Sequence, residues 1–339
     1  MELLLDKLST RSGTFQGTYF LSLCRMKIQV LIDNRDAGQA RIQTKVQPEW
    51  GLSAFIEFND RRILLDTGAS ANFAANATAL GVDLSTVDAG VLSHAHYDHA
   101  GGMEAFFKAN DHACFYLHEG AGENCYSRHK FLKLFSYQKY IGIHRGWLKR
   151  YSNRIKFVGG SSRDFANNSS HASANSPTCD PANSSSSDIA EILPGVFLVG
   201  HNDAIFSAES RAAIAARNGL SIKLNGKYIP DSFNHEQSLV FDTPQGLFIM
   251  NSCSHGGADN IVKEIQTAFP GKKIYAILGG FHLYKTPDSK IREFAERLRT
   301  LDVQKIYTGH CTGDRAFEIL KDVLGNRAEQ MYTGLEIEI

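Results

Sequence analysis

Short runs of alternating apolar and polar residues dominate the first part of the chain and predict β-strands. We expect strands at residues 27–33, 52–58, 61–66 and 87–92, and an extended segment at 113–118. Because only the polar pair Asn59-Asp60 separates the second run from the third, these two runs are predicted to form a hairpin. Residues 71–80 and 103–109 instead have patterns that favour helices.

The second half of the chain alternates between strand and helix patterns. Extended segments are expected at 192–199, 237–242, 247–250, 273–278 and 304–308, and helices at 259–269, 288–300 and 314–324. The segments 237–242 and 247–250 predict a second hairpin, and a short strand pair is expected near the C-terminus. Early hairpins followed by strand–helix alternation are typical of an α/β fold with two mixed sheets covered by helices.

Three segments differ in composition from this pattern. Residues 1–25 precede the first strand, and we interpret them as an extension outside one domain that spans 26–339. Residues 128–163 contain ten Lys and Arg and no Asp or Glu, interleaved with aromatic residues, so an insertion is expected at about 128–160. It could be a solvated basic face or a wall that attracts an anionic substrate. The Ser/Asn-rich stretch at about 161–190 is too polar to bury a core and predicts a disordered insertion.

Composition excludes some classes of protein. The chain has 339 residues with 36 Lys+Arg and 36 Asp+Glu, so its formal net charge is zero, which argues against a protein that coats nucleic acid. No apolar run reaches the roughly 18–20 residues of a membrane span. Six cysteines lack a CxxC pair, and the start lacks the order of a signal peptide, so we expect a cytoplasmic protein with no membrane partner.

The positions of the histidines point to metal chemistry. The loop after the strand at 87–92 holds His94, His96, Asp98 and His99 within six residues, followed by Gly101-Gly102. Imidazole suits zinc and related transition metals, and the carboxylate suits a second, harder position. Because His94 and His96 alternate in sequence, an extended turn can point both rings the same way.

Three later histidines occupy the same kind of position. His255 follows the strand at 247–250, His282 follows the one at 273–278, and His310 follows the one at 304–308. The ends of adjacent strands meet at one edge of a sheet, where ligands bind in α/β folds. We therefore expect these histidines to join the first group.

These motifs resemble those of the metallo-β-lactamase superfamily. HAHYDH at 94–99 resembles its HxHxDH signature, and LLDTGAS at 64–70 precedes it in the usual way. The phrases MKIQVLIDN, WGLSAFIEF, LSHAHYDHAGGMEAF, HEQSLVF, SCSHGGADNIV, LGGFHLY and TGHCTG resemble one branch of metal-dependent hydrolase-like proteins. That branch includes the archaeal dihydropterin ribofuranosylaminobenzene phosphate synthases. The resemblance covers about 26–160 and 191–339 and implies a four-layer αββα sandwich, with two mixed sheets flanked by helices.

The resemblance also implies a set of ligands for two divalent metal ions. The first ion would be held by His94, His96 and His255, and the second by Asp98, His99 and His310. Zinc is the expected metal, with Mn, Fe or Mg as alternatives. Asp66 would orient a ligand loop from behind the metal site.

One departure from the family pattern concerns His282. Many members carry an acid or a cysteine between the third and fifth motifs, whereas this chain has His282 in GGFH. His282 could bind metal, bind substrate or transfer a proton, so the number of metals stays open. Cys253 and Cys311 flank ligand candidates, and we interpret both as packing beside the site.

The leading functional hypothesis is a metal-dependent hydrolase in which metal-activated water attacks an ester, lactone or phosphoester of an anionic small molecule. Asp98 and His282 are its catalytic candidates, and Gly280, Thr312 and Gly313 its candidates for substrate binding. An alternative is a synthase-like transferase that joins a pterin methyl diphosphate to an arylamine and releases pyrophosphate. A second alternative is a non-catalytic metal- or ligand-binding protein. The sequence does not indicate the oligomeric state.

Overall fold

The computed structural model describes residues 25–36, 45–131, 135–159 and 189–339. Its first sheet has seven strands in the order β18-β1-β2-β3-β4-β5-β8. Their bounds are β1 (Met26–Ile32), β2 (Ser53–Phe58), β3 (Arg61–Leu65), β4 (Ala89–Val91), β5 (Cys114–His118), β8 (Ile155–Val158) and β18 (Glu336–Glu338). Asn59 and Asp60 both have positive φ, as a two-residue turn between twisted strands requires, and the predicted β2–β3 hairpin is confirmed.

The second sheet also has seven strands, in the order β17-β16-β15-β14-β13-β10-β9. Their bounds are β9 (Ile189–Leu193), β10 (Val196–Gly200), β13 (Gln237–Thr243), β14 (Gly246–Met250), β15 (Ile274–Gly279), β16 (Lys305–Thr308) and β17 (Ala328–Gln330). The hairpin of β13 and β14 is confirmed. The single extended segment predicted at 192–199 is wrong: Gly195, at φ 74°, turns the chain between β9 and β10, which pair antiparallel.

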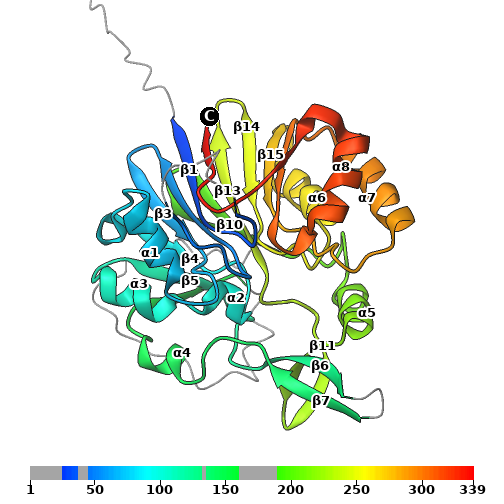
Figure 1. The fold of residues 1–339 in the computed structure, drawn as a ribbon, viewed down its shortest axis with the longest axis horizontal. Coiled ribbons are helices and arrows are strands. Elements are labelled where there is room, and N and C mark those ends of the chain that lie inside the picture. The colour runs from blue at the N-terminus through cyan, green and yellow to red at the C-terminus, as the bar shows by residue number, and fades with distance from the viewer. Residues whose placement is uncertain (1–24, 37–44, 132–134, 160–188) are drawn as a thin grey trace, which may run out of the picture.

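Helices cover the outer faces of both sheets. Those on the first sheet are α1 (Asn72–Ala79), α2 (Tyr97–Ala100), α3 (Met103–Ala109) and α4 (Trp147–Arg150), and those on the second are α6 (Ala258–Ala268), α7 (Asp288–Thr300) and α8 (Asp314–Leu324). One buried cluster joins the two sheets, for example through Ile56 and Phe248, and two further clusters join each sheet to its helices. Figure 1 shows these layers, so the four-layer αββα sandwich is confirmed.

A third, four-stranded sheet was not predicted. Its order is β12-β11-β6-β7, and it projects from the lower end of the molecule in Figure 1. Its strands are β6 (Cys125–Phe131), β7 (Phe135–Tyr140), β11 (Leu220–Leu224) and β12 (Lys227–Pro230), and α5 (Ala208–Asn218) precedes β11. Asn225-Gly226, a strong hairpin signal, joins β11 to β12. The predicted insertion at 128–160 is therefore not one unit, because β8 within it pairs with β5 in the first sheet.

The expected C-terminal strand pair is also wrong. β17 pairs with β16 in the second sheet, whereas β18 pairs with β1 in the first, so the chain end crosses between the sheets. Apart from Arg25, the predicted extension lies outside the described residues. Except for residues 189–190, so does the Ser/Asn-rich stretch.

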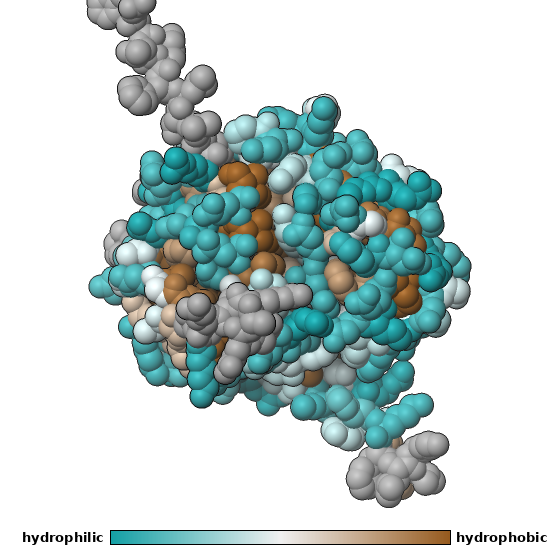
Figure 2. All heavy atoms as spheres, turned by 45° about the horizontal axis from the view of Figure 1, so that its top comes forward, coloured by the Kyte–Doolittle hydropathy of each residue, from teal (hydrophilic) through white to brown (hydrophobic). Residues whose placement is uncertain are grey.

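One face of the molecule is mainly polar. The face shown in Figure 2 is mostly hydrophilic, with small hydrophobic areas among polar side chains. Within the described parts of the chain, every helix is too short or too polar to cross a bilayer.

Candidate metal centre

Four loops that follow β-strands bring the predicted histidines together. His94, His96 and His99 follow β4, whereas His255, His282 and His310 follow the parallel strands β14, β15 and β16. Parallel strands present their carboxyl ends at one edge, as expected. The rings of His94 and His255 lie 5.0 Å apart and those of His99 and His310 also 5.0 Å apart, measured between centroids.

Asp66 holds the first loop from behind. It lies directly after β3 with φ 55°, and its side chain is fully buried. Its two carboxylate oxygens accept hydrogen bonds from the Ser93 amide (2.7 Å), the Ser93 hydroxyl (2.7 Å) and His99 Nδ1 (2.7 Å). Because a carboxylate only accepts, His99 carries its proton on Nδ1, and its Nε2 is left with a free lone pair. The position expected for Asp66 is thus the one observed.

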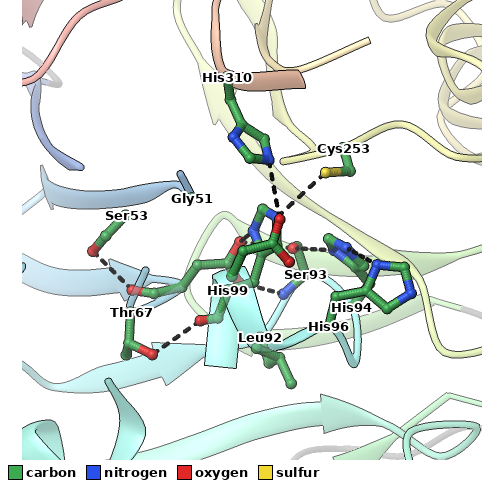
Figure 3. Close-up of polar contacts among 12 residues, drawn as sticks. Gly51, Ser53, Thr67, Leu92, Ser93, His94, His96, His99, Cys253 and His310 are labelled. Atoms are coloured by element: carbon green, nitrogen blue, oxygen red, sulfur yellow. Dashed lines mark hydrogen bonds and ion pairs between the residues drawn. The ribbon is translucent and has the colours of Figure 1, made fainter. Parts of the chain in front are cut away.

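His94 and His96 face each other as two ligands of one ion would. The Ser93 hydroxyl, having donated to Asp66, accepts from His94 Nδ1 at 2.9 Å, which leaves His94 Nε2 without a proton. His94 Nε2 lies 3.1 Å from His96 Nδ1. Two nitrogens on one tetrahedral zinc ion, at bond lengths of about 2.0 Å, lie about 3.3 Å apart. Figure 3 shows the two side chains side by side.

His255 completes this first group. Its ring stacks on Phe233, with centroids 4.3 Å apart and an interplanar angle of 3°. Glu236 accepts a hydrogen bond from the backbone N–H of His255 at 2.8 Å. Potential ligand atoms of His94, His255 and Cys253 lie within 4.8 Å of one another.

A second group forms around His99 and His310. His310 Nδ1 lies 2.9 Å from the side-chain oxygen of Asn34, so His310 also directs an unprotonated Nε2 into the site. Asp98 Oδ2 lies 3.8 Å from His99 Nε2 and 3.6 Å from His310 Nε2. The three side chains predicted for one ion are therefore adjacent.

Cys253 lies between the two groups. Its sulfur is within 4.8 Å of the ligand atoms of His94 and His255, and also of those of His99 and His310. Figure 3 shows Cys253 and His310 both directed toward His99, and the Cys253 sulfur is 3.3 Å from His99 Nε2. A thiolate at this point could be a ligand in either metal position, a more central place than the packing role that the sequence suggested for Cys253.

His282 also points toward the centre. It adopts φ 50°, unusual for a non-glycine residue, and its ring centroid lies 4.6 Å from that of His255. It forms a further group with Cys253 and Cys311, whose sulfur atoms are 3.4 Å apart.

The electrostatics of the site fit a divalent cation. Burial lowers the pKa of His96 and of His310 to about 3, and burial together with neighbouring imidazoles lowers the pKa of His94 well below its usual value. These three rings are therefore neutral, which is the form that binds metal, whereas Asp98 and Asp66 raise the pKa of His99 despite its burial. Buried nitrogens of His96, His255, His282 and His310 have no hydrogen-bond partner. Unpaired buried polar atoms are costly, and metal ions would satisfy the Nε2 atoms of His255 and His310.

Three residues that support the site were missed. Asn34 orients His310, Glu236 holds the His255 loop, and the indole N–H of Trp50 donates to Asp98 Oδ2 at 2.9 Å. All three lie within phrases that resemble the superfamily branch, MKIQVLIDN, HEQSLVF and WGLSAFIEF. Those phrases were the only signal, because nothing local shows which distant side chain each residue contacts.

The proposed substrate-binding residues are mostly engaged inside the fold. The Gly280 N–H donates to the Ser252 carbonyl at 2.8 Å, and a Cβ there would lie 2.5 Å from the Cys311 sulfur. The Thr312 hydroxyl accepts from the Phe281 N–H and lies 2.6 Å from that of Thr308. A substrate anion would have to displace these bonds. Gly313 directly precedes α8 at φ 76°.

Comparison with known proteins agrees with this geometry. The profile described as Metallo-beta-lactamase superfamily matches residues 50–155. The 7,8-dihydropterin-6-methyl-4-(β-D-ribofuranosyl)-aminobenzene-5'-phosphate synthase of Methanocaldococcus jannaschii is 28% identical over 298 residues, which cover 85% of this chain and 90% of that protein. An uncharacterized protein of the same archaeon is 25% identical, over 87% of this chain and 94% of its own length.

Solved structures show the same architecture. The crystal structure of a metal-dependent hydrolase of the β-lactamase superfamily is 27% identical, with a TM-score of 0.67, and the match covers 93% of this chain and 99% of the other. A metallo-β-lactamase fold protein from Bacillus subtilis is 12% identical, with a TM-score of 0.50 over 93% of this chain and 100% of the other, and supports the fold alone. The αββα layers, the HxHxDH loop and these matches together assign the chain to the metallo-β-lactamase superfamily.

Proposed function

We propose that this protein is a metal-dependent hydrolase that holds two divalent ions, with zinc as the first candidate. The observation that carries the proposal is the pair of buried imidazole groups around Cys253, with unpaired nitrogens directed inward. His94, His96 and His255 would hold one ion, and Asp98, His99 and His310 the other. Cys253 would be available to both.

Bound divalent ions would supply a water of lowered pKa and would stabilise negative charge on a leaving oxygen. The protein side chains would then orient the reacting groups and donate a proton to the leaving group. Asp98 offers one carboxylate oxygen to the Trp50 N–H, so its carboxyl group is held in one orientation. His282, whose buried Nδ1 has no hydrogen-bond partner, would donate the proton that the leaving group requires.

We propose an anionic small molecule as the substrate, because paired cations beside neutral imidazoles favour negative charge. The basic stretch contributes less than its composition suggests. Arg150 pairs with Glu104 at 2.9 Å, and Arg154 donates to the carbonyls of Asn110 and Ala113. These two cations hold α4 and β8 in the fold.

The transferase is a second candidate, and one observation favours it. The archaeal relative that is 28% identical over 85% of this chain is named as a synthase. In that reaction the arylamine nitrogen would form a bond to the pterin methylene carbon as the C–O bond to diphosphate breaks, and pyrophosphate and the amine proton would leave. The same ligand candidates would hold the metal that stabilises the diphosphate charge. Both candidates need stabilisation of negative charge on a departing oxygen, which is an alkoxide or phosphate oxygen in hydrolysis and a diphosphate oxygen in the transfer.

Metal content and activity together test both candidates. Protein loaded with zinc or manganese is assayed for metal by mass spectrometry. It is then tested on phosphodiesters, on lactones, and on the pterin diphosphate with 4-aminobenzoate. About two metals per chain, and turnover of an ester or lactone without amine, are expected. Pyrophosphate release that depends on the amine, with no ester or lactone turnover, would replace the hydrolase by the transferase.

The matched variants are His94→Ala and His112→Ala. His112 is a surface histidine with a side chain 56% exposed. We expect His94→Ala to lose metal and activity and His112→Ala to keep both. Metal binding equal to the wild type in His94→Ala would contradict the proposed centre.

A further inference from the structure

Large aromatic side chains remain exposed beside the metal centre. The described residues include seven exposed large hydrophobic side chains, and four of these lie on the projecting third sheet. The other three are Trp50 (43% exposed), Tyr97 (41%) and Tyr284 (37%). Tyr97 stands next to Asp98 in sequence, and Tyr284 lies two residues after His282. Exposed aromatic surface that recurs at one site indicates binding rather than packing.

Trp50 and Tyr284 contact each other and the histidines of the site. The ring centroids of Trp50 and Tyr284 lie 5.5 Å apart at an angle of 70°, and the Trp50 ring is 5.2 Å from that of His310 at 58°. The Tyr284 ring in turn lies 5.4 Å from that of His282.

Trp50 is both exposed and fixed. Its indole N–H donates to Asp98, which stops the ring from rotating freely, and Tyr284 packs against it edge-on. Neither Tyr284 nor His310 lies parallel to the indole, so neither ring is stacked on it, and the side chain keeps 43% of its surface exposed. A rigid, exposed indole can stack on a flat ligand with little loss of side-chain entropy.

A cation lies next to this group. Lys285 Nζ is 4.9 Å from the centroid of the Tyr284 ring. Aromatic rings beside a lysine suit a ligand that combines a flat ring with a negative charge.

We propose that Trp50 and Tyr284 form an aromatic platform that binds a planar aromatic ring of an anionic substrate next to the metal centre. This inference rests on the proposed function, because it places the reacting group of that ligand at the metals. It narrows the substrate class from small anions in general to aromatic anions.

The test measures a ring preference by titration calorimetry on the metal-loaded protein. The probes are 2-naphthoate, which is planar, and decahydro-2-naphthoate, which has the same charge and carbon skeleton but a saturated ring. We expect 2-naphthoate to bind at least about fivefold more tightly, because stacking on an aromatic face requires a flat partner. Equal affinity of the two probes would overturn the platform.

Three variants test whether the preference for a planar ring depends on the platform. Trp50→Leu should reduce it to about twofold or less, and Trp50→Phe, which keeps a ring but loses the N–H donor, should retain most of it. Tyr228→Leu removes a comparably exposed ring (44%) on β12 of the third sheet and should leave the preference intact. A ring preference that survives in Trp50→Leu would contradict the proposal. So would a preference that falls as much in Trp50→Phe or in Tyr228→Leu as it does in Trp50→Leu.

Metal analysis of each variant separates this inference from the proposed function. A wild-type protein that binds no metal would contradict the metal centre, whereas its ring preference would still report on the platform. Two bound metals without any ring preference would contradict the platform alone.

Discussion

Asp66 illustrates how one buried carboxylate prepares several ligands at once. Its oxygens accept from the Ser93 amide, the Ser93 hydroxyl and His99 Nδ1, and through that hydroxyl it also sets the tautomer of His94. An asparagine amide in its place would direct an N–H toward Ser93 or His99, which are themselves hydrogen-bond donors to this position. Partners of this kind change metal affinity by about 10–100-fold.

We therefore expect Asp66→Asn to weaken metal binding by about 10-fold or more. The measurement is a competition titration with a chromogenic chelator. The control is Asp111→Asn, which alters an exposed carboxylate outside the site. Unchanged affinity in Asp66→Asn would mean that the tautomers of His94 and His99 do not depend on this carboxylate.

The two adjacent cysteines allow a second test at the residue scale. Cys253 belongs to three of the candidate ligand groups, whereas Cys311 belongs to one. We expect Cys253→Ser to lower the affinity for both metal ions and Cys311→Ser to change it much less, as measured by metal content during stepwise dialysis against a chelator. A larger loss in Cys311→Ser would reverse the roles assigned to the two sulfurs.

At the scale of elements, the close approach of β15 to the end of β14 positions two ligand loops. Gly279 lies at φ 152°, and a Cβ on it would come within 1.7 Å of the Asn251 carbonyl oxygen. Backbone cannot yield as a flexible side chain does, so only glycine fits here. The loops that carry His255 and His282 depend on this contact.

Gly279→Ala is expected to reduce the free energy of unfolding by about 3 kcal/mol or more, since overpacking adds to an unfavourable φ. Gly81→Ala is the control, because Gly81 has φ 77° but nothing within 4 Å of the added atom. The loss of free energy of unfolding in Gly81→Ala should stay near the roughly 1–2 kcal/mol that a left-handed backbone conformation costs a non-glycine residue. Urea unfolding measures both variants, and equal losses would contradict the close approach.

At the scale of the whole molecule, metal ions bound between the two sheets should stabilise the fold. The ligand candidates come from loops of both sheets, so an ion would link the halves of the sandwich. An ion at 100 times its Kd adds about 2.7 kcal/mol to the free energy of unfolding. Removal of metal with a chelator should lower Tm, and zinc should restore it. A Tm that is the same in both states would contradict a metal bound by the folded protein.

The pH dependence of the metal-free protein follows from its buried neutral histidines. Burial holds the pKa of His96, His118 and His310 at about 3, below the value of about 6.5 in an unfolded chain. Between these values the unfolded chain binds more protons, so stability falls as the pH decreases. Asp33, whose pKa burial raises to about 6, offsets part of the loss.

We expect the free energy of unfolding in the presence of a chelator to fall by a few kcal/mol between pH 6.5 and pH 5. His201, whose pKa is raised to about 9 by Glu236 and Glu264 despite its burial, keeps its proton in the fold, whereas the unfolded imidazole becomes protonated over this range, so His201 also offsets a small part of the loss. Urea unfolding at the two pH values is the measurement. Stability that rises toward pH 5 would show that the site histidines are protonated in the fold.

Local pattern was enough for the main elements and for the central ligands. Strand alternation identified the hairpins of both sheets, and the spacing of His94, His96, Asp98 and His99 identified the loop that holds the central ligand candidates. The third sheet was missed because β6 and β11, which pair in it, are distant in sequence: the paired residues Ser127 and Leu220 lie 93 positions apart. The sequence does contain the hairpin signal Asn225-Gly226, but nothing in it shows which distant strand pairs with that hairpin.

By itself the sequence determined the superfamily, the αββα layers and the loops that supply the imidazoles, because periodicity and short motifs are properties of neighbouring residues. The tertiary structure decided what lies between those loops. It placed the Cys253 sulfur between two groups of histidines and set Asn34 against His310, 276 positions away in the chain. It also left Trp50 exposed yet bonded to Asp98. Such contacts depend on the pairing of distant strands, and only the folded chain brings those residues together.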